Sequence, residues 1–160
     1  MTKPMTLWGV GPLWALISIS YAIAAGFITR AFPALRIPEA LYPALTFLGI
    51  FLIVLGLPYY VLSARAVLRA FAAGELVTDG VYGICRHPLY GSWIVFIVPG
   101  IELLLHSWFG LTTSLAMYAA LRLLARREEM FLAEKFGDRY LQYQARVPFV
   151  LPVGWLKQKN

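Results

Sequence analysis

Two long apolar runs constrain the fold of this chain more than any other feature. Residues 7–28 and 41–62 contain no Asp, Glu, Lys or Arg. A helix needs about 20 apolar residues to cross a hydrocarbon core of about 30 Å, and each run is long enough. The first run is too long for the core of a signal peptide and has no convincing small-residue cleavage site, so we expect it to be retained as a span.

The composition excludes several other classes of protein. Hydrophobic residues make up 60% of the 160 residues and charged residues 14%, whereas a soluble domain is about half apolar and about a quarter charged. A disordered chain and an ordinary soluble enzyme are therefore excluded. The single cysteine, Cys85, excludes an internal disulfide framework.

A third apolar stretch, residues 89–124, is too long for one span and too short for three. His106 and Ser107 interrupt it, so we divide it into spans at 89–105 and 108–124, with a kink at Pro99-Gly100. We therefore expect an all-α, polytopic membrane protein with four transmembrane helices, forming a single membrane domain over residues 1–160.

The distribution of basic residues predicts the orientation. Of the 14 Lys and Arg residues, only Arg30 and Arg36 fall in the loop between the first two spans. All the others lie on the opposite side, which the positive-inside rule makes cytoplasmic. Both termini are then cytoplasmic, and the net charge of +6 is explained by topology and anionic lipid headgroups without a nucleic acid partner.

The C-terminal region predicts one more helix. Leu132, Phe136, Tyr140 and Tyr143 recur at helical spacing between residues 125 and 146. We interpret them as the apolar side of a cytoplasmic amphipathic helix that lies on the membrane surface. Gly137 is expected to mark a bend, and the helix is expected to end before Pro148.

Ionisable residues are expected to meet at the cytoplasmic end of the third and fourth spans. Arg86 and His87 precede the third span, and Glu128 and Glu129 follow the fourth. A helical hairpin returns the chain to the same face, so the two pairs should converge. Each pair alone is also explained as a topology anchor or as a solvated charge run, and only their convergence favours a functional site.

Neighbouring residues add to this candidate site. Tyr82 and Tyr90 flank the basic pair, and Pro88 suits the first turn of the third span. The free amides of that helix start attract a carboxylate or a phosphate. The two histidines are predicted to lie on opposite sides of the membrane and no paired cysteines exist, so we expect no metal site.

Glu102 lies inside the third predicted span, near its outer end. An intramembrane carboxylate is a functional candidate, and four spans with one such group also fit a small proton-coupled transporter. The alternative is that Glu102 caps the helix or pairs near the outer interface, four residues before His106.

Three sequence blocks resemble the isoprenylcysteine carboxyl methyltransferases. Residues 76–91, LVTDGVYGICRHPLYG, are similar to that family's LVTxGxYxxxRHPxYxG signature. Residues 127–129, REE, and 136–143, FGDRYLQY, resemble its EE…FGxxYxxY block, and RVP at 146–148 with LP at 151–152 resembles its RVPxxLP ending. The RHPxYxG part is shared with phospholipid N-methyltransferases, and the ending favours the carboxyl methyltransferase branch.

The resemblance implies a membrane-embedded methyltransferase that uses S-adenosylmethionine. Its cofactor region would be residues 76–91 together with 122–152. The cofactor-binding residues implied by the motifs are Tyr82, Arg86, His87, Pro88, Tyr90, Glu128 and Glu129. Arg146 matches an arginine placed toward a substrate carboxylate, and His87 is the obvious candidate for a base if the acceptor is an amine or a thiol. Gly74 is a departure, because many members carry a histidine there.

The resemblance also implies a lipophilic acceptor. A prenylcysteine-like carboxylate is the family expectation, and it needs no general base because it is already ionised at pH 7. A phospholipid or thiol acceptor remains open, as does a prenylated protein or a free lipid. The transporter centred on Glu102 is the alternative from another functional class.

Overall fold

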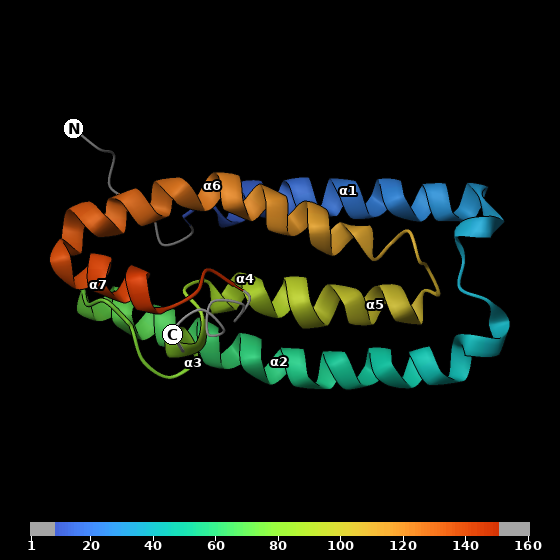
Figure 1. The fold of residues 1–160 in the computed structure, drawn as a ribbon, viewed down its shortest axis with the longest axis horizontal. Coiled ribbons are helices and arrows are strands. Elements are labelled where there is room, and N and C mark those ends of the chain that lie inside the picture. The colour runs from blue at the N-terminus through green and yellow to red at the C-terminus, as the bar shows by residue number, and fades with distance from the viewer. Residues whose placement is uncertain (1–8, 151–160) are drawn as a thin grey trace, which may run out of the picture.

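The computed structural model describes residues 9–150, which fold into antiparallel helical passes (Figure 1). No β-strand forms within this range; a single isolated bridge pairs Arg36 with Ser107. The helices are α1 (Gly11–Ala31), α2 (Tyr42–Ala73), α3 (Val81–Ile84), α4 (Pro88–Ser92), α5 (Val98–Leu104), α6 (Thr112–Phe136) and α7 (Asp138–Arg146). The all-helical expectation is confirmed for the described residues.

The four long passes form two layers. α1 packs beside α6, and α2 packs beside α4 and α5, as Figure 1 shows from the side. The loops on either side of α3 and the short α7 gather at one end of the bundle. The connection between α1 and α2, which contains the short 3-10 turns Pro33–Leu35 and Glu39–Leu41, lies at the other end. This arrangement places the chemistry-bearing loops at a single end.

Two helical segments are long and apolar enough to cross a membrane. They are Gly11–Ala31 and Glu39–Ala73, and Pro88–Leu104 is a shorter apolar helix. Large apolar side chains also point outward from the bundle, among them Phe27, Phe47 and Leu115, each at least 70% exposed. A water-soluble protein buries such side chains, whereas a membrane protein presents them to lipid.

α2 is longer than the span expected at 41–62. It continues to Ala73, because residues 63–73 are rich in Ala and also contain Arg and Leu, all of which favour helix. Gly74 ends it in the left-handed conformation (φ 67°), and its N–H reaches the carbonyls of Ala70 and Phe71. This is the usual glycine terminator of a helix. The first expected span, 7–28, corresponds to α1, and residues 7 and 8 lie outside the described range.

The third pass runs without interruption from α4 to α5. A kink was expected at Pro99-Gly100. The irregularity lies just upstream of these two residues instead, where Trp93–Ile97 forms a π-helical segment. Pro99 lacks the N–H that would continue the α-helical ladder, which favours a shift of the bonding pattern upstream. The fourth pass was expected at 108–124. It begins at Thr112 instead, and it continues as one helix to Phe136.

The predicted bend at Gly137 is confirmed, since its φ of 55° separates α6 from α7. The prediction that the apolar side of residues 125–146 lies on the membrane surface is wrong. Tyr140 is only 1% exposed and Tyr143 is buried, and both pack on Leu76 in the loop after α2. The apolar side of this region therefore contacts protein. The extended α2 places the loop that follows it, with Leu76, against α7.

Glycines let α2 and the third pass approach closely. A Cβ at Gly49 would lie 2.8 Å from the carbonyl oxygen of Gly100, and a Cβ at Gly56 would lie 2.7 Å from the Cβ of Phe96. Small residues of this kind allow helix backbones to pack tightly inside membranes.

We predict that Gly49→Ala destabilises the protein, because the added methyl meets backbone rather than a movable side chain. Overpacking of this kind costs about 1–3 kcal/mol. The matched control is Gly26→Ala in α1, where a Cβ meets nothing within 4 Å. Thermal melts in detergent should show a lower melting temperature for the first variant only; equal melts would contradict this packing.

Candidate active site

The two ends of the helical hairpin meet in an ion pair. The Arg86 guanidinium, in the loop before α4, lies 2.9 Å from Glu129 of α6 through both Nε and Nη2. His87 Nε2 lies 3.4 Å from the same oxygen. The predicted convergence of the basic and acidic residues at one end of the bundle is thus what the structure contains.

Arg86 also holds the end of α7. Its Nη1 donates to the carbonyls of Gln144 (3.0 Å) and Val147 (2.7 Å). Gln144 in turn donates from Nε2 to the second oxygen of Glu129 at 3.2 Å. Every nitrogen of the guanidinium therefore has a protein partner, so this side chain serves to fix three chain segments together.

Backbone pairing reinforces the same junction. The N–H groups of Arg86 and His87 donate to the carbonyls of Pro148 and Phe149, at 2.8 and 3.1 Å. The Phe149 ring packs on the His87 ring, with centroids 4.5 Å apart, and lies under the Arg122 guanidinium at 4.7 Å. The segment after α7 is thereby held against the loop that carries the candidate residues.

The protonation of Glu129 follows from this environment. Burial favours the neutral acid, but the hydrogen bond from His87 and the charge of Arg86 outweigh it and hold the pKa of Glu129 below its usual range. Glu129 is consequently ionised at neutral pH and locked in the ion pair.

A cavity of about 870 Å³ lies beside this junction. Its polar end includes Tyr82, Arg86, His87, Tyr90 and Glu128. The rest of the lining is mainly apolar and comes from both layers of the bundle: Pro12, Trp14 and Ala15 of α1, Tyr60, Ala64, Val67, Leu68, Ala70 and Phe71 of α2, Trp93, and Phe131, Leu132 and Phe136 of α6. Sites for small molecules commonly have this volume and this mixture of surfaces.

Glu128 is the buried carboxylate of the cavity. It is 9% exposed, and its Oε1 accepts a hydrogen bond of 2.8 Å from the N–H of Val10, just before α1. Gly9 permits this approach, because a side chain there would overlap the carboxylate. The site therefore draws on the start of the first helix as well as on the hairpin.

The structure separates the candidate residues into three groups. Tyr82, Arg86, His87, Tyr90 and Glu128 line the cavity. Pro88, at the first turn of α4, and Glu129 lie directly behind that lining. Arg146 is apart: it is exposed at the end of α7, where its Nε donates to the Gln142 carbonyl. Leu151 and Pro152 of the third block lie outside the described residues.

Sequence reasoning missed several aromatic residues of the cavity. Trp14, Tyr60 and Trp93 line it, but each lies inside an apolar run, where nothing distinguishes an inward side chain from one that faces lipid. Gln144 was also missed. Its position in the FGxxYxxY–RVP interval is the signal that would have pointed to it.

Two further residues have structural explanations. Gly74 stands where many isoprenylcysteine carboxyl methyltransferases carry a histidine, and in this structure it ends α2 in the left-handed conformation. Cys85 is 2% exposed, and burial raises the pKa of its thiol despite the nearby Tyr59, His87 and Arg86. A buried neutral thiol is a core side chain rather than a nucleophile.

The ion-pair network should contribute strongly to stability. We expect Arg86→Gln and Glu129→Gln each to cost about 3 kcal/mol, because each leaves a poorly hydrated charge without its partner. Arg127→Gln, an exposed change on the same helix, is the control. Because folding lowers the pKa of Glu129, its contribution is present above the ordinary carboxyl pKa of about 4.3 and is lost as the pH falls through the folded value.

The measurement is thermal unfolding of the wild type and of the Arg86→Gln, Glu129→Gln and Arg127→Gln variants, from neutral to acidic pH. The wild type should lose this part of its stability on acidification, and Glu129→Gln should not. A Glu129→Gln protein as stable as wild type at pH 7 would show that the network is dispensable.

Comparisons with known proteins agree with the motifs. The family model described as phospholipid methyltransferase matches residues 44–139. Proteins named protein-S-isoprenylcysteine O-methyltransferase are 38% identical over 77 residues in Mus musculus, covering 48% of this chain and 27% of that protein, and 35% identical over 79 residues in Schizosaccharomyces pombe, covering 49% and 33%.

A protein from Oryza sativa subsp. indica, named probable protein-S-isoprenylcysteine O-methyltransferase, is 26% identical over 149 residues, covering 86% of this chain and 78% of its own length. The chain spans about a quarter of the length of the mammalian relatives. No solved structure matches it. Since the family model covers more than half of the sequence, the chain belongs to the phospholipid methyltransferase family.

Proposed function

We propose that this chain is a membrane-embedded methyltransferase that moves a methyl group from S-adenosylmethionine to the carboxylate of a lipophilic, prenylcysteine-like acceptor. The observation that carries the proposal is the cavity itself. Its lining combines polar side chains, among them Glu128 and those of the loop before α4, with apolar side chains from α1, α2 and α6. One polar cosubstrate and one lipid-tailed cosubstrate fit these two surfaces.

The proposed topology follows from the helical passes. We infer four spans, corresponding to α1, α2, the α4–α5 pass and α6, within a single membrane domain of residues 1–160. Arg30 and Arg36 line a separate pocket that shares no residue with the cavity. The other basic residues between 9 and 150 lie in the C-terminal parts of α2 and α6, in the loop before α4 and in α7, which are the segments that meet at the cavity end. The positive-inside rule then assigns the cavity end and both termini to the cytoplasm.

The residues at the polar end suit the methyl donor. S-Adenosylmethionine supplies a methyl group on a cationic sulfonium and leaves as a neutral thioether. Tyr82, Tyr90 and Trp93 offer aromatic faces, which attract such a cation. The Glu128 carboxylate offers an acceptor to the donor's ammonium or ribose hydroxyls.

Arg86 and Glu129 are proposed as positioning residues. The guanidinium has protein partners at each nitrogen, so it has little capacity left for a ligand carboxylate. Its work is to hold the loop that presents His87 and Tyr82 to the cavity. Pro88 starts α4 immediately after this loop and fixes its direction.

The acceptor is proposed from the shape and charge of the site. A carboxylate oxygen attacks the methyl carbon while the carbon–sulfur bond breaks, and no proton has to move. The enzyme then acts by holding the two reactants in line. The relatives' name specifies O-methylation of prenylcysteine, and the apolar lining from α1 and α2 suits a prenyl tail.

A phospholipid amine or a thiol is the alternative acceptor. Either would need to lose a proton, and His87 is the candidate base, although its Nε2 already contacts Glu129. Arg146 is left out of the proposed contacts, because its side chain lies outside the cavity.

The first test is cofactor binding. We expect the detergent-purified protein to bind S-adenosylmethionine, and Glu128→Gln to weaken binding roughly tenfold, because a charge-assisted hydrogen bond contributes about 1.5–3 kcal/mol. Titration calorimetry measures this directly. Arg139→Gln, an exposed change on α7, should bind like wild type. Absence of binding in both detergent and nanodiscs would refute the methyltransferase assignment.

The second test distinguishes the acceptors. With an S-prenylated N-acylcysteine in nanodiscs, transfer of a labelled methyl group should change little between about pH 6 and pH 8, because the acceptor carboxylate and Glu129 are ionised throughout. The corresponding carboxamide is the matched control and should accept nothing. Transfer to phosphatidylethanolamine instead, with a rate that rises with pH, would favour the amine alternative.

A further inference from the structure

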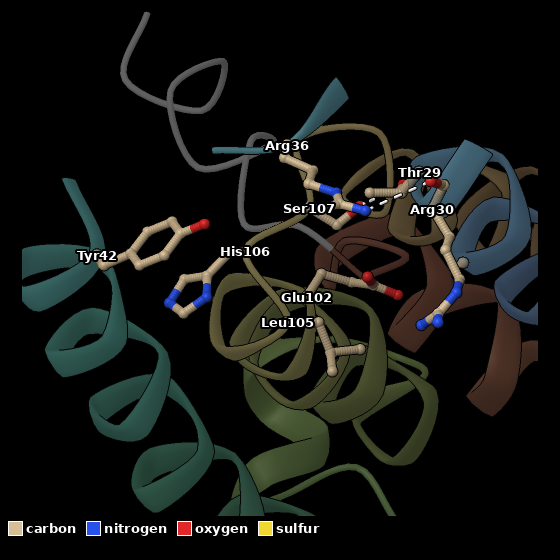
Figure 2. A pocket seen from close by; sticks show the side chains of 9 residues that line it. Thr29, Arg30, Arg36, Tyr42, Glu102, Leu105, His106 and Ser107 are labelled. Atoms are coloured by element: carbon tan, nitrogen blue, oxygen red, sulfur yellow. Dashed lines mark hydrogen bonds between the residues drawn. The ribbon is translucent and has the colours of Figure 1, made fainter. Parts of the chain in front are cut away.

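A second pocket, of about 400 Å³, lies at the end of the bundle opposite the cavity, and it shares no lining residue with it. Figure 2 shows the side chains that line it, which come from three segments: the end of α1, the connection to the start of α2, and the end of α5 with the turn that follows it. The lining includes Thr29, Arg30, Arg36, Tyr42, Glu102, Leu105, His106 and Ser107.

Hydrogen bonds fasten these three segments together. Thr29 Oγ1 and Ser107 Oγ are 2.7 Å apart, and the Gly110 N–H donates to the same Ser107 oxygen at 2.7 Å. The Ile37 N–H donates to the His106 carbonyl at 2.8 Å. The walls of the pocket are therefore set by the fold before any ligand arrives.

His106 is part of this construction. It has a φ of 53°, and it is the one residue other than glycine with positive φ between residues 9 and 150. Its ring stacks on Tyr42, with centroids 3.6 Å apart, and its Nε2 lies 3.2 Å from Thr46 Oγ1. A left-handed conformation at such a residue persists only where its surroundings hold it, and these contacts do so.

Glu102 points into the pocket without a partner. The residue is 6% exposed, and its carboxyl group makes no hydrogen bond or ion pair with any residue in the described range. Gly110 leaves room for it, since a Cβ there would overlap the carboxyl oxygen. A buried carboxyl group needs a hydrogen-bond partner, and residues 9–150 supply none, which leaves this group open to a ligand.

The rim carries the opposite charge. Arg30 and Arg36 are both exposed, and Arg36 Nη2 donates to the Arg30 carbonyl at 3.4 Å rather than to Glu102. Leu105, which lines the pocket, is an exposed apolar side chain, and so is Phe27, which follows the lining residue Gly26 on α1. The site thus combines two cations at the rim, one carboxyl group inside, and apolar surface beside them.

We propose that this pocket binds the headgroup of an aminophospholipid. The phosphate would lie on Arg30 and Arg36, the primary ammonium would donate to Glu102, and the acyl chains would lie along the apolar surface. A choline headgroup has no N–H to donate, and a glycerol headgroup has no positive charge, so neither matches Glu102. This inference does not depend on methyl transfer, because lipid binding is measured without a methyl donor.

The test measures lipid binding to the delipidated full chain by native mass spectrometry. The three lipids compared are dioleoyl phosphatidylethanolamine, phosphatidylcholine and phosphatidylglycerol. We expect phosphatidylethanolamine to bind roughly tenfold more tightly than the other two, the size expected of one charge-assisted hydrogen bond. Glu102→Gln should remove this preference. Arg30→Gln with Arg36→Gln should weaken all three lipids.

Two matched variants control for charge. Glu39→Gln removes an exposed carboxylate at the same end of the bundle, and Arg69→Gln removes a cation on α2, and neither residue lines the pocket. Both should keep the preference. Equal affinity for the three lipids, or a preference that survives Glu102→Gln, would overturn the proposal.

A labelling experiment covers the case in which Glu102→Gln does not fold. Leu105 is exposed at the pocket, so Leu105→Cys should react with a maleimide, while Cys85 is buried. Phosphatidylethanolamine should slow the reaction several-fold more than phosphatidylcholine. Equal protection by the two lipids, or full protection by soluble glycerophosphoethanolamine alone, would overturn the assignment to a membrane lipid.

Discussion

The Arg86 guanidinium is the interaction on which the rest of the candidate site depends. One side chain joins the loop before α4, the α6 carboxylate of Glu129 and the carbonyls at the end of α7. It is only 12% exposed, so its charge has to be compensated locally. With this ion pair and these hydrogen bonds in place, the loop before α4 presents Tyr82 and His87 to the cavity, and α7 packs against Leu76.

Much of this arrangement could be predicted from the sequence. Uncharged runs identify apolar helices, because a bilayer allows few other solutions for the backbone. A tight hairpin between the third and fourth passes requires their far ends to meet, and that geometry predicted that Arg86 and His87 converge with Glu128 and Glu129. The ion pair of Arg86 with Glu129 itself was seen only in the structure. The bend at Gly137 was predictable because glycine tolerates positive φ.

The rest depends on packing that a single sequence does not reveal. α2 continues beyond its apolar run because helix propensity does not stop at the edge of the hydrocarbon, and this extension gives Tyr140 and Tyr143 a protein surface instead of a membrane. Trp93 enters the cavity from a π-helical segment, whose altered register no periodicity argument includes. Arg146 was placed by its motif, but the direction of its side chain is set by how α7 packs on its neighbours.

The two-layer construction of the cavity has a kinetic consequence. Much of its apolar lining comes from α1 and α2, the two helices that are long and apolar enough to meet lipid, while its polar residues come from the loop before α4, from Tyr90 of α4 and from Glu128 of α6. For the proposed enzyme, one reactant arrives from water and the other diffuses in two dimensions within the bilayer. The relevant concentration of the second is its mole fraction among the lipids, so diluting it with inert lipid slows turnover even when the amount per volume of solution is unchanged.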